Sequence, residues 1–556
     1  LYEARARGRR RKQAGKRDLR PRAHRACERG RERPPRRAAN PQRGQPRAAR
    51  AAAREGGAAA TERQPEKQTR KQTRKARARS RMAAGKQGGA KAKGLAPAGS
   101  AAAAAKKKSE MWSGASTSES VGIGPEALRA TLMPVLLVLS TPLTSIILSR
   151  SVVTTKHDSS FLENAWDVIE EILEKGIVYT YTRDAFNPFV WKMIGTYMVV
   201  QLLLMRFMPG PTYEGPQSPM GNRPIYKDNC FACYVASFAL YGLGVYSGLF
   251  NGGIAFDYFQ EFIASMNIFA LIFVAILYVK GAVAPSSSDS GLSGNIAFDY
   301  YWGTELYPRI LGWDVKVFTN CRYGMTGWAL LCTSFAYAQY ERFGEVSNSI
   351  LIAAALQVIY LAKFHIWERG YMFTIDIMHD RAGYYICWGC LVWVPSLYAA
   401  PTAFLVLHPY NFPTWAAAAQ FVFCLLSIFL NYDVDRQRQE FRAKDGKMKI
   451  WGKDAEYLVA EYTTSDGKKH SSMLLHSGWW GQARKINYFF ELCAAFSWSV
   501  IVAHPFHLLA WVYFAFLFIL LIDRAWRDDA RCASKYGEKW DEYKVKVPYL
   551  IIPGVY

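Results

Sequence analysis

The stretch LLAWVYFAFLFILLIDRAWRDDARCASKYG, residues 508–537, joins an apolar run directly to a charged and aromatic segment. Its first half, with its flanks, is long enough to cross a bilayer as a helix. Asp528, Cys532 and Tyr536 follow at i, i+4 and i+8, so a continuing helix places them on one face. Gly537 stands where such a helix is expected to end. We predict a membrane helix that leads into a pocket, the alternative being an amphipathic helix that lies on the headgroups.

The hydropathy beyond residue 125 divides into about ten apolar stretches of helical length. Several of them are short or interrupted by polar residues, as is typical of helices that line an internal cavity. The sequence therefore predicts an all-α fold, a polytopic transmembrane helix bundle. The predicted spans are 128–150, 189–208, 232–250, 264–284, 324–340, 349–367, 384–406, 415–432, 487–504 and 506–523.

The net charge of +25 comes from the head of the chain, because residues 1–110 hold 35 of the 70 basic residues but 8 of the 45 acidic ones. A segment with so few aromatic residues cannot bury enough apolar area to offset the entropy of ordering. We expect residues 1–125 to be a disordered basic segment and 126–556 to form the membrane domain. The head could bind anionic partners; alternatively, translation begins at Met82 and the residues before it are not made.

Cations also mark the sides of the membrane. Residues 436–485, between the eighth and ninth predicted spans, are rich in Lys and Arg, as is the tail after Asp523. The positive-inside rule places both segments in the cytosol. We therefore expect the chemistry of the C-terminal half, about residues 431–556, to face the cytosol.

Arg438 and Arg442 lie at i, i+4, so on a helix their guanidinium groups point the same way. Two such forks suit the 2′-phosphate of a dinucleotide, although ordinary positive-inside charge is the alternative. No G-x-G-x-x-G motif follows a predicted strand, so a nicotinamide cofactor would have to be held by membrane helices and loops. We expect no metal site, because the pairs Cys230/Cys233 and Cys387/Cys390 lie far apart without histidines at finger spacing.

The sixth predicted span carries ionisable residues in the apolar sequence LQVIYLAKFHIWE. Such groups usually face a bundle interior or an aqueous cavity. Tyr360 and Lys363 lie one turn apart, and a cation beside a phenol makes it a better proton donor. Alternatively, Lys363, His365 and Glu368 reach toward the interface near the helix end. A second polar group precedes the seventh span and either lines a site or holds a loop: Asp376, His379 and Asp380.

Long motifs along residues 125–556 resemble the sterol reductase family, particularly its plant-type 7-dehydrocholesterol reductase branch. The C-terminal run R-D-x-x-x-C-x-x-K-Y-G-x-x-W-x-x-Y and the segment LLHSGWWGQARKINY, residues 474–488, resemble its two signatures. The other motifs are EGPQSPMGNRPIYKDN (214–229), APSSSDSG (284–291), DYYWGTELYPRI (299–310), TIDIMHDRAGYYICWGCLVWVPSLY (374–398) and NYDVDRQRQEFR (431–442).

The resemblance implies an NADPH site and a sterol site. Lys485 replaces the histidine that is usual in the family, which puts a specific histidine role in doubt. Tyr360 matches the tyrosine placed next to the sterol double bond, and Asp528 matches its acidic partner; we take Glu368 and the Asp376 group as further pocket candidates. The positions implied for NADPH are Arg438, Arg442, Leu475, Trp480, Asn487, Tyr488, Asp528, Cys532, Ala533, Ser534, Lys535, Tyr536 and Tyr543.

The function that this resemblance implies is NADPH-dependent reduction of the Δ7 double bond of Δ5,7-sterols, by protonation of the alkene and hydride transfer. It also implies a multi-pass protein of the endoplasmic reticulum membrane that takes sterol from the bilayer. Three alternatives remain at this point. They are a Δ14-sterol reductase, an isoprenylcysteine methyltransferase-like enzyme and a non-enzymatic nuclear-envelope scaffold that uses the basic head.

Overall fold

The computed structural model describes residues 128–153, 161–218, 220–463, 469–502 and 508–556. The basic head predicted to be disordered, residues 1–125, lies outside these ranges.

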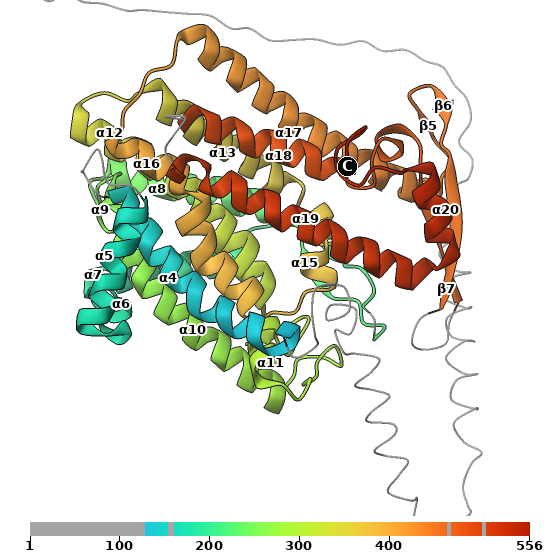
Figure 1. Ribbon diagram of the computed structural model, residues 1–556, viewed down its shortest axis with the longest axis horizontal. Helices are drawn as coiled ribbons and strands as arrows, with labels where there is room; N and C mark the ends of the chain where they lie inside the picture. The colour runs from blue at the N-terminus through green and yellow to red at the C-terminus, as the bar shows by residue number, and fades with distance from the viewer. Residues whose placement is uncertain (1–127, 154–160, 219, 464–468, 503–507) are drawn as a thin grey trace, which may run out of the picture. The chain divides into compact units, whose positions relative to one another are not determined.

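The described residues are mostly helical (Figure 1). Three segments, η1, η2 and η3, have the wider π-helical winding; the first two continue directly into α4 and α12, and one residue separates η3 from α16. The helices are η1 Leu128–Leu132, α4 Met133–Val153, α5 Phe161–Lys175, α6 Ile177–Thr182, α7 Pro188–Phe207, α8 Cys230–Tyr246, α9 Ile254–Asp257, α10 Phe259–Val283, α11 Ile296–Trp302, η2 Val317–Met325, α12 Thr326–Phe343, α13 Asn348–Ile366, α14 Glu368–Tyr371, α15 Ile375–Met378, η3 Tyr384–Tyr398, α16 Ala400–Leu407, α17 Thr414–Ala443, η4 Gly478–Gly481, α18 Ile486–Val502, α19 Leu508–Tyr536 and α20 Glu538–Lys546.

The strands of the described chain form four antiparallel pairs. None of these pairs extends into a larger sheet, which agrees with the missing dinucleotide-binding motif. The longest pair places Tyr457 opposite Leu475. The pairs are β1 Thr212–Glu214 with β2 Ile225–Lys227, β3 Arg309–Ile310 with β4 Trp313–Asp314, β5 Lys449–Ile450 with β6 Lys453–Asp454, and β7 Tyr457–Thr463 with β8 Lys469–Leu475.

Each predicted apolar stretch overlaps a helix of the described chain. Seven helical segments there are long and apolar enough to cross a membrane, and α8 is apolar but shorter. The prediction of a helical membrane protein is thereby confirmed, whereas the number of ten spans stays a prediction. The seven are Ala130–Val153, Pro188–Phe207, Phe259–Val283, Asn348–Ile366, Tyr384–Leu407, Thr414–Ala443 and Leu508–Tyr536.

Polar groups inside the bundle bond to one another. The helices α4, α10 and η3 pack together around one apolar core. Within it, the Asn267 amide donates to Ser145 Oγ at 2.8 Å and accepts from the Trp388 indole at 3.0 Å. All three side chains are buried, and an unsatisfied polar group in lipid costs several kcal/mol. The amide therefore ties three helices together.

The C-terminal helices α17, α18 and α19 lie side by side, and β5–β7 and α20 gather at one end of them (Figure 1). The helix α17 runs past its predicted end at residue 432 to Ala443. Its last turns bury Val434 and Phe441 in a small apolar cluster with Trp480, which explains why this polar sequence stays helical. The helix α19 ends at Tyr536, as predicted, and the chain turns at Gly537 with φ 52°.

Candidate functional site

The last turns of α17 carry the two arginines that were predicted to share a helix face. The Arg438 guanidinium stacks on the Trp480 ring at 3.9 Å from its centre and pairs with Asp435 at 3.2 Å. The Trp480 indole donates to Val434 O at 2.9 Å, so the ring that supports Arg438 is itself fixed. One of the two cations is therefore held in place by its surroundings.

The second arginine, Arg442, is exposed. Across the described chain, its guanidinium has no ion pair or hydrogen bond with an acid. The charges of Arg438 and Arg531 lie close enough to repel it. A group of cations without enough carboxylates suits an anionic ligand, and Arg in particular suits phosphate.

The sequence motif that contains Lys485 meets α19 through an ion pair. The Lys485 ammonium contacts one oxygen of the Asp528 carboxylate, and Arg531 contacts the other. Burial disfavours the charged form of Lys485, but the Asp528 carboxylate outweighs it and raises the pKa of Lys485 above its usual value. Asp528 is thus committed to two cations.

The remaining residues predicted at this end lie around β8 and α20. Tyr543 donates to Leu475 O at 2.9 Å, and the Tyr536 hydroxyl donates to Ser472 Oγ at 3.2 Å. The Lys535 ammonium lies 3.9 Å from the centre of the Tyr462 ring. Cys532 and Tyr543 are buried in one apolar cluster, and the partly buried Ala533 and Tyr536 pack against that cluster. Ser534 is exposed.

Tyr360 on α13 contacts a carboxylate that the sequence analysis did not single out. Its hydroxyl donates to Glu491 Oε1 of α18, and its ring packs against Trp328 and Trp498 at 6.0 and 5.4 Å between centres. The expected partner, Asp528, has both oxygens on Lys485 and Arg531 instead. The acid in the apolar run INYFFELCAAF is the signal that could have identified Glu491.

A chain of polar groups leads from this tyrosine toward the arginines. The Lys363 ammonium, one turn after Tyr360, donates to Asn431 Oδ1 of α17. The Asn431 amide donates to Asn487 O at 2.8 Å, and the Asn487 amide reaches Asp435 Oδ1 at 3.5 Å. Asp435 is also the partner of Arg438, so polar contacts lead from Lys363 to Arg438, and the Lys363 ammonium lies 5.8 Å from the centre of the Tyr360 ring. Tyr488, beside Asn487, packs against the apolar core.

The other acids proposed as pocket residues form ion pairs with α19. Asp376 pairs with Arg524 of α19 at 2.9 Å. Asp380 pairs with Arg527 at 3.6 Å and accepts a hydrogen bond from His379 Nδ1 at 2.9 Å. Of the two readings of this polar group, these contacts favour a loop that is fastened to α19.

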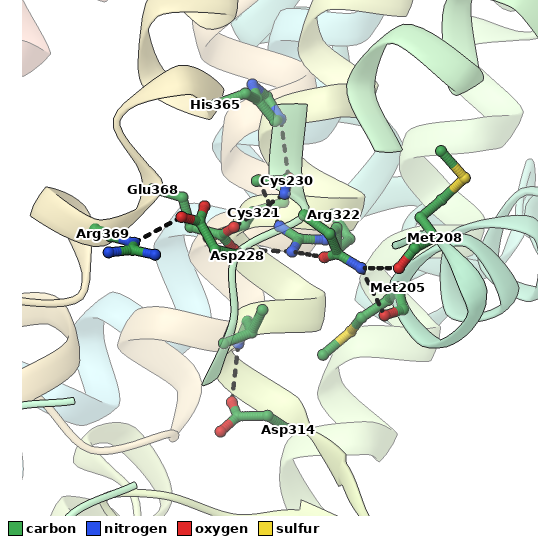
Figure 2. A network of polar contacts seen from close by, with 12 residues as sticks. Met205, Met208, Asp228, Cys230, Asp314, Cys321, Arg322, His365, Glu368 and Arg369 are labelled. Atoms are coloured by element: carbon green, nitrogen blue, oxygen red, sulfur yellow. Dashed lines mark hydrogen bonds and ion pairs between the residues drawn. The ribbon is translucent and has the colours of Figure 1, made fainter. Parts of the chain in front are cut away.

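Glu368, proposed as a pocket residue or as a group that reaches the interface, lies buried in an ion pair, which disfavours the interface. Its place in the sterol pocket stays a prediction. Its carboxylate pairs with Arg322 of η2 at 2.8 Å, and both side chains are 1% exposed. Figure 2 shows the surrounding network of polar contacts. Glu368 also accepts from Cys230 N at 2.9 Å, so the pair fastens the starts of α8 and α14 to η2. A partner in a distant helix offsets the cost of burying this acid.

The same network brings together three metal-ligand types. The thiols of Cys230 and Cys321 and the Glu368 carboxylate lie within 4.8 Å of one another. The Arg322 guanidinium, however, contacts both Cys230 Sγ and Glu368 Oε1. A cation therefore already neutralises this carboxylate, and we interpret the cluster as an ion-pair lock and not as a metal centre.

Comparison with known proteins identifies the family to which this chain belongs. Residues 128–556 match the model of the Ergosterol biosynthesis ERG4/ERG24 family. The chain belongs to this family of sterol reductases. It is 48% identical to a 7-dehydrocholesterol reductase of Arabidopsis thaliana over 405 residues, which covers 72% of the chain and 93% of the relative.

Other sterol reductases are more distant. Identity is 33% with a 7-dehydrocholesterol reductase of Xenopus laevis, covering 70% of the chain and 83% of the relative. It is 35% with a Delta(14)-sterol reductase of Methylotuvimicrobium alcaliphilum, covering 66% and 84%. The chain is therefore an oxidoreductase of sterol biosynthesis and a multi-pass membrane protein, which decides against the methyltransferase-like alternative.

We predict that Glu368→Gln in this sterol reductase destabilises the fold by about 3–5 kcal/mol, because it leaves the Arg322 charge buried without a partner. The measurement is the thermal unfolding temperature of the protein in detergent. Asp228→Asn is the matched control, since it breaks the neighbouring Arg369–Asp228 pair, whose side chains are 50% and 30% exposed. That control should cost less than about 1 kcal/mol. Equal losses in the two variants would contradict the lock.

Proposed function

We propose that the protein reduces the Δ7 double bond, C7–C8, of Δ5,7-sterols with NADPH. The observation that carries the cofactor assignment is the group of Arg438, Arg442 and Arg531, in which Arg442 has no acidic partner among the described residues. The bond assignment is supported by the 48% identity to a relative named 7-dehydrocholesterol reductase, against 35% for a Delta(14) relative.

The residues at the end of α17 fit a dinucleotide phosphate. Arg438 is held in place by Trp480 and Asp435, whereas the exposed Arg442 is free to approach a ligand. A bound 2′-phosphate would relieve the repulsion among the three guanidinium groups. NADPH, when bound, supplies the hydride of the reduction. We assign to Asp528 the task of positioning Lys485 and Arg531 at this end of the site.

Tyr360 is the proton donor in this proposal. An alkene that carries no electron-withdrawing group resists hydride attack, so a protein acid must protonate it first. The Tyr360 hydroxyl would turn its hydrogen from Glu491 to the sterol: its Oη–H bond breaks as the sterol C–H bond forms, and a protonated Glu491 would then return a proton to the phenolate across the same contact. Trp328 and Trp498 exclude water around the phenol, which protects the cationic sterol from capture.

The cellular setting follows from the same topology. We propose a multi-pass location in the endoplasmic reticulum membrane, with the arginine end of α17 facing the cytosol, where NADPH is supplied. The positive-inside rule supports this orientation. Sterol would then enter from the bilayer, between helices of the bundle.

The substrate assignment is tested in membranes from a yeast strain that lacks its own sterol reductases. Expressed in that strain, the protein should convert 7-dehydrocholesterol to cholesterol and leave a Δ8,14-diene unchanged, with products identified by gas chromatography and mass spectrometry. Reduction of only the Δ8,14-diene would assign the protein to the Δ14 reaction instead.

We predict that the Arg438→Ala/Arg442→Ala double variant raises the KM for NADPH roughly tenfold or more, with little change in the KM for sterol. Each substitution removes a charge-assisted contact to the cofactor phosphate. The measurement is initial rates at varied NADPH. Lys539→Ala is the control, because Lys539 is exposed and paired with Glu542 on α20. A wild-type protein that uses NADH as well as NADPH would overturn the phosphate assignment.

Removing the acid group of Tyr360 gives the sharpest test of the mechanism. Tyr360→Phe keeps the ring and its packing, so we expect binding of both ligands to survive while turnover falls by about 10²–10⁴. Glu491→Gln should also lower turnover, and the double variant should lose less than the sum of the two effects. Ligand binding and turnover are measured on the same preparations.

Tyr398→Phe provides the matched control for this test. It removes a hydroxyl from a ring that packs against Trp328 at 5.2 Å, in the same aromatic cluster. Turnover of this variant should stay within about twofold of wild type. The substitution keeps the packing of the ring and removes a hydroxyl that takes no part in the proposed proton transfer. Near-normal turnover of Tyr360→Phe would move the proton donor elsewhere.

A further inference from the structure

One face of α17 meets lipid along its apolar half. Val422, Leu426 and Phe429 are 63%, 52% and 59% exposed and follow one another at helical spacing. The same spacing continues into Asp433 and Arg436, one and two turns further along the helix. These turns follow the apolar stretch directly, so they lie at the depth of the lipid headgroups.

A cleft of about 490 Å³ opens on this face, between the last turns of α17 and the β5–β6 hairpin. Arg436 and Glu440 line it from the helix side, and Lys447, Lys449 and Trp451 line it from the hairpin side. The cleft therefore begins where the lipid-facing stripe of α17 ends.

The charge of the cleft is positive. Arg436 bridges Asp433 and Glu440, and Lys444 also pairs with Glu440, so two cations offset these two acids. Lys447 and Lys449 are exposed, and within the described ranges neither ammonium is paired with an acid. Two free ammonium groups at headgroup depth attract anionic phospholipid.

The tip of the hairpin presents an aromatic ring beside these cations. Trp451 is 61% exposed and has a left-handed φ of 50°, a conformation that is uncommon for a residue with a side chain. Its ring contacts Trp479 edge-on, with 5.1 Å between centres. Tryptophan is favoured at the boundary between acyl chains and headgroups, which gives the exposed ring a place there.

We propose that this cleft binds the headgroup of an anionic phospholipid, with Lys447 and Lys449 on the phosphate and Trp451 against the acyl boundary. The site is separate from the proposed cofactor cations. Trp479 donates to the cleft residue Asp433 at 2.8 Å, whereas Trp480 stacks on Arg438. The continuity with the lipid-facing stripe favours a lipid over a soluble anion.

The test measures binding of dioctanoyl phosphatidylglycerol and dioctanoyl phosphatidylcholine to the full chain in a nonionic detergent. Wild type should prefer phosphatidylglycerol, and Lys447→Gln/Lys449→Gln should weaken that binding about tenfold or more. Lys469→Gln/Lys539→Gln removes the same charge from β8 and α20 and should stay within about twofold of wild type, because neither residue lines the cleft and solvent screens exposed charges outside it. Equal weakening in both double variants would overturn the proposal.

Two further experiments distinguish a membrane lipid from a soluble phosphate as the anion that binds. Glycerol 3-phosphate should compete poorly; competition as strong as that of the lipid would assign the cleft to a soluble phosphate and overturn the proposal. In phosphatidylglycerol vesicles with brominated acyl chains, Trp451→Phe should show less tryptophan quenching than wild type. Equal quenching in wild type and Trp451→Phe would place Trp451 away from the acyl chains and contradict its proposed position.

Discussion

The cost of placing charge in a bilayer governs the arrangement of this protein. At membrane depth, buried charges are held by partners from other helices, as in Arg322–Glu368 between η2 and α14 and Arg524–Asp376 between α19 and α15. These pairs connect segments that are far apart in sequence, so they fix the order of packing as well as the charge. Arg442 differs from these buried charges, because it is exposed and has no acidic partner among the described residues. Its place beside Arg438 at the end of α17 marks the proposed cofactor site.

The reactive end of the sterol reductase depends on contacts among α13, α17 and α18. Tyr360 donates to Glu491 of α18, and Lys363 donates to Asn431 of α17. The helix α13 is therefore bonded to both α17, which carries Arg438 and Arg442, and α18. The Asn431–Asn487 contact then joins α17 to α18. The polar contacts that hold Arg438 thus reach Lys363, one helical turn from the proposed proton donor. Their relative positions follow from helix packing and not from mobile loops.

Features with a local pattern could be predicted from the sequence. The apolar runs predicted the helices, and the i, i+4 spacing predicted that Arg438 and Arg442 share a face of α17. Residues whose role depends on a distant partner could not. Glu491 contacts a tyrosine 131 positions away, and Glu368 pairs with an arginine 46 positions away, so nothing beside them in sequence reveals the contact. The roles predicted for the site residues themselves remain predictions.

Consecutive tryptophans in η4 point to opposite sides of α17. Trp479 bonds to Asp433 and touches the hairpin ring Trp451, while Trp480 carries Arg438. Because the two indoles belong to adjacent residues, a ligand that moved the first would also displace the second. If a headgroup bound on one side altered the affinity for a dinucleotide on the other, the dinucleotide would alter the affinity for the headgroup by the same factor. Reductase activity would then report the lipid composition of its own membrane.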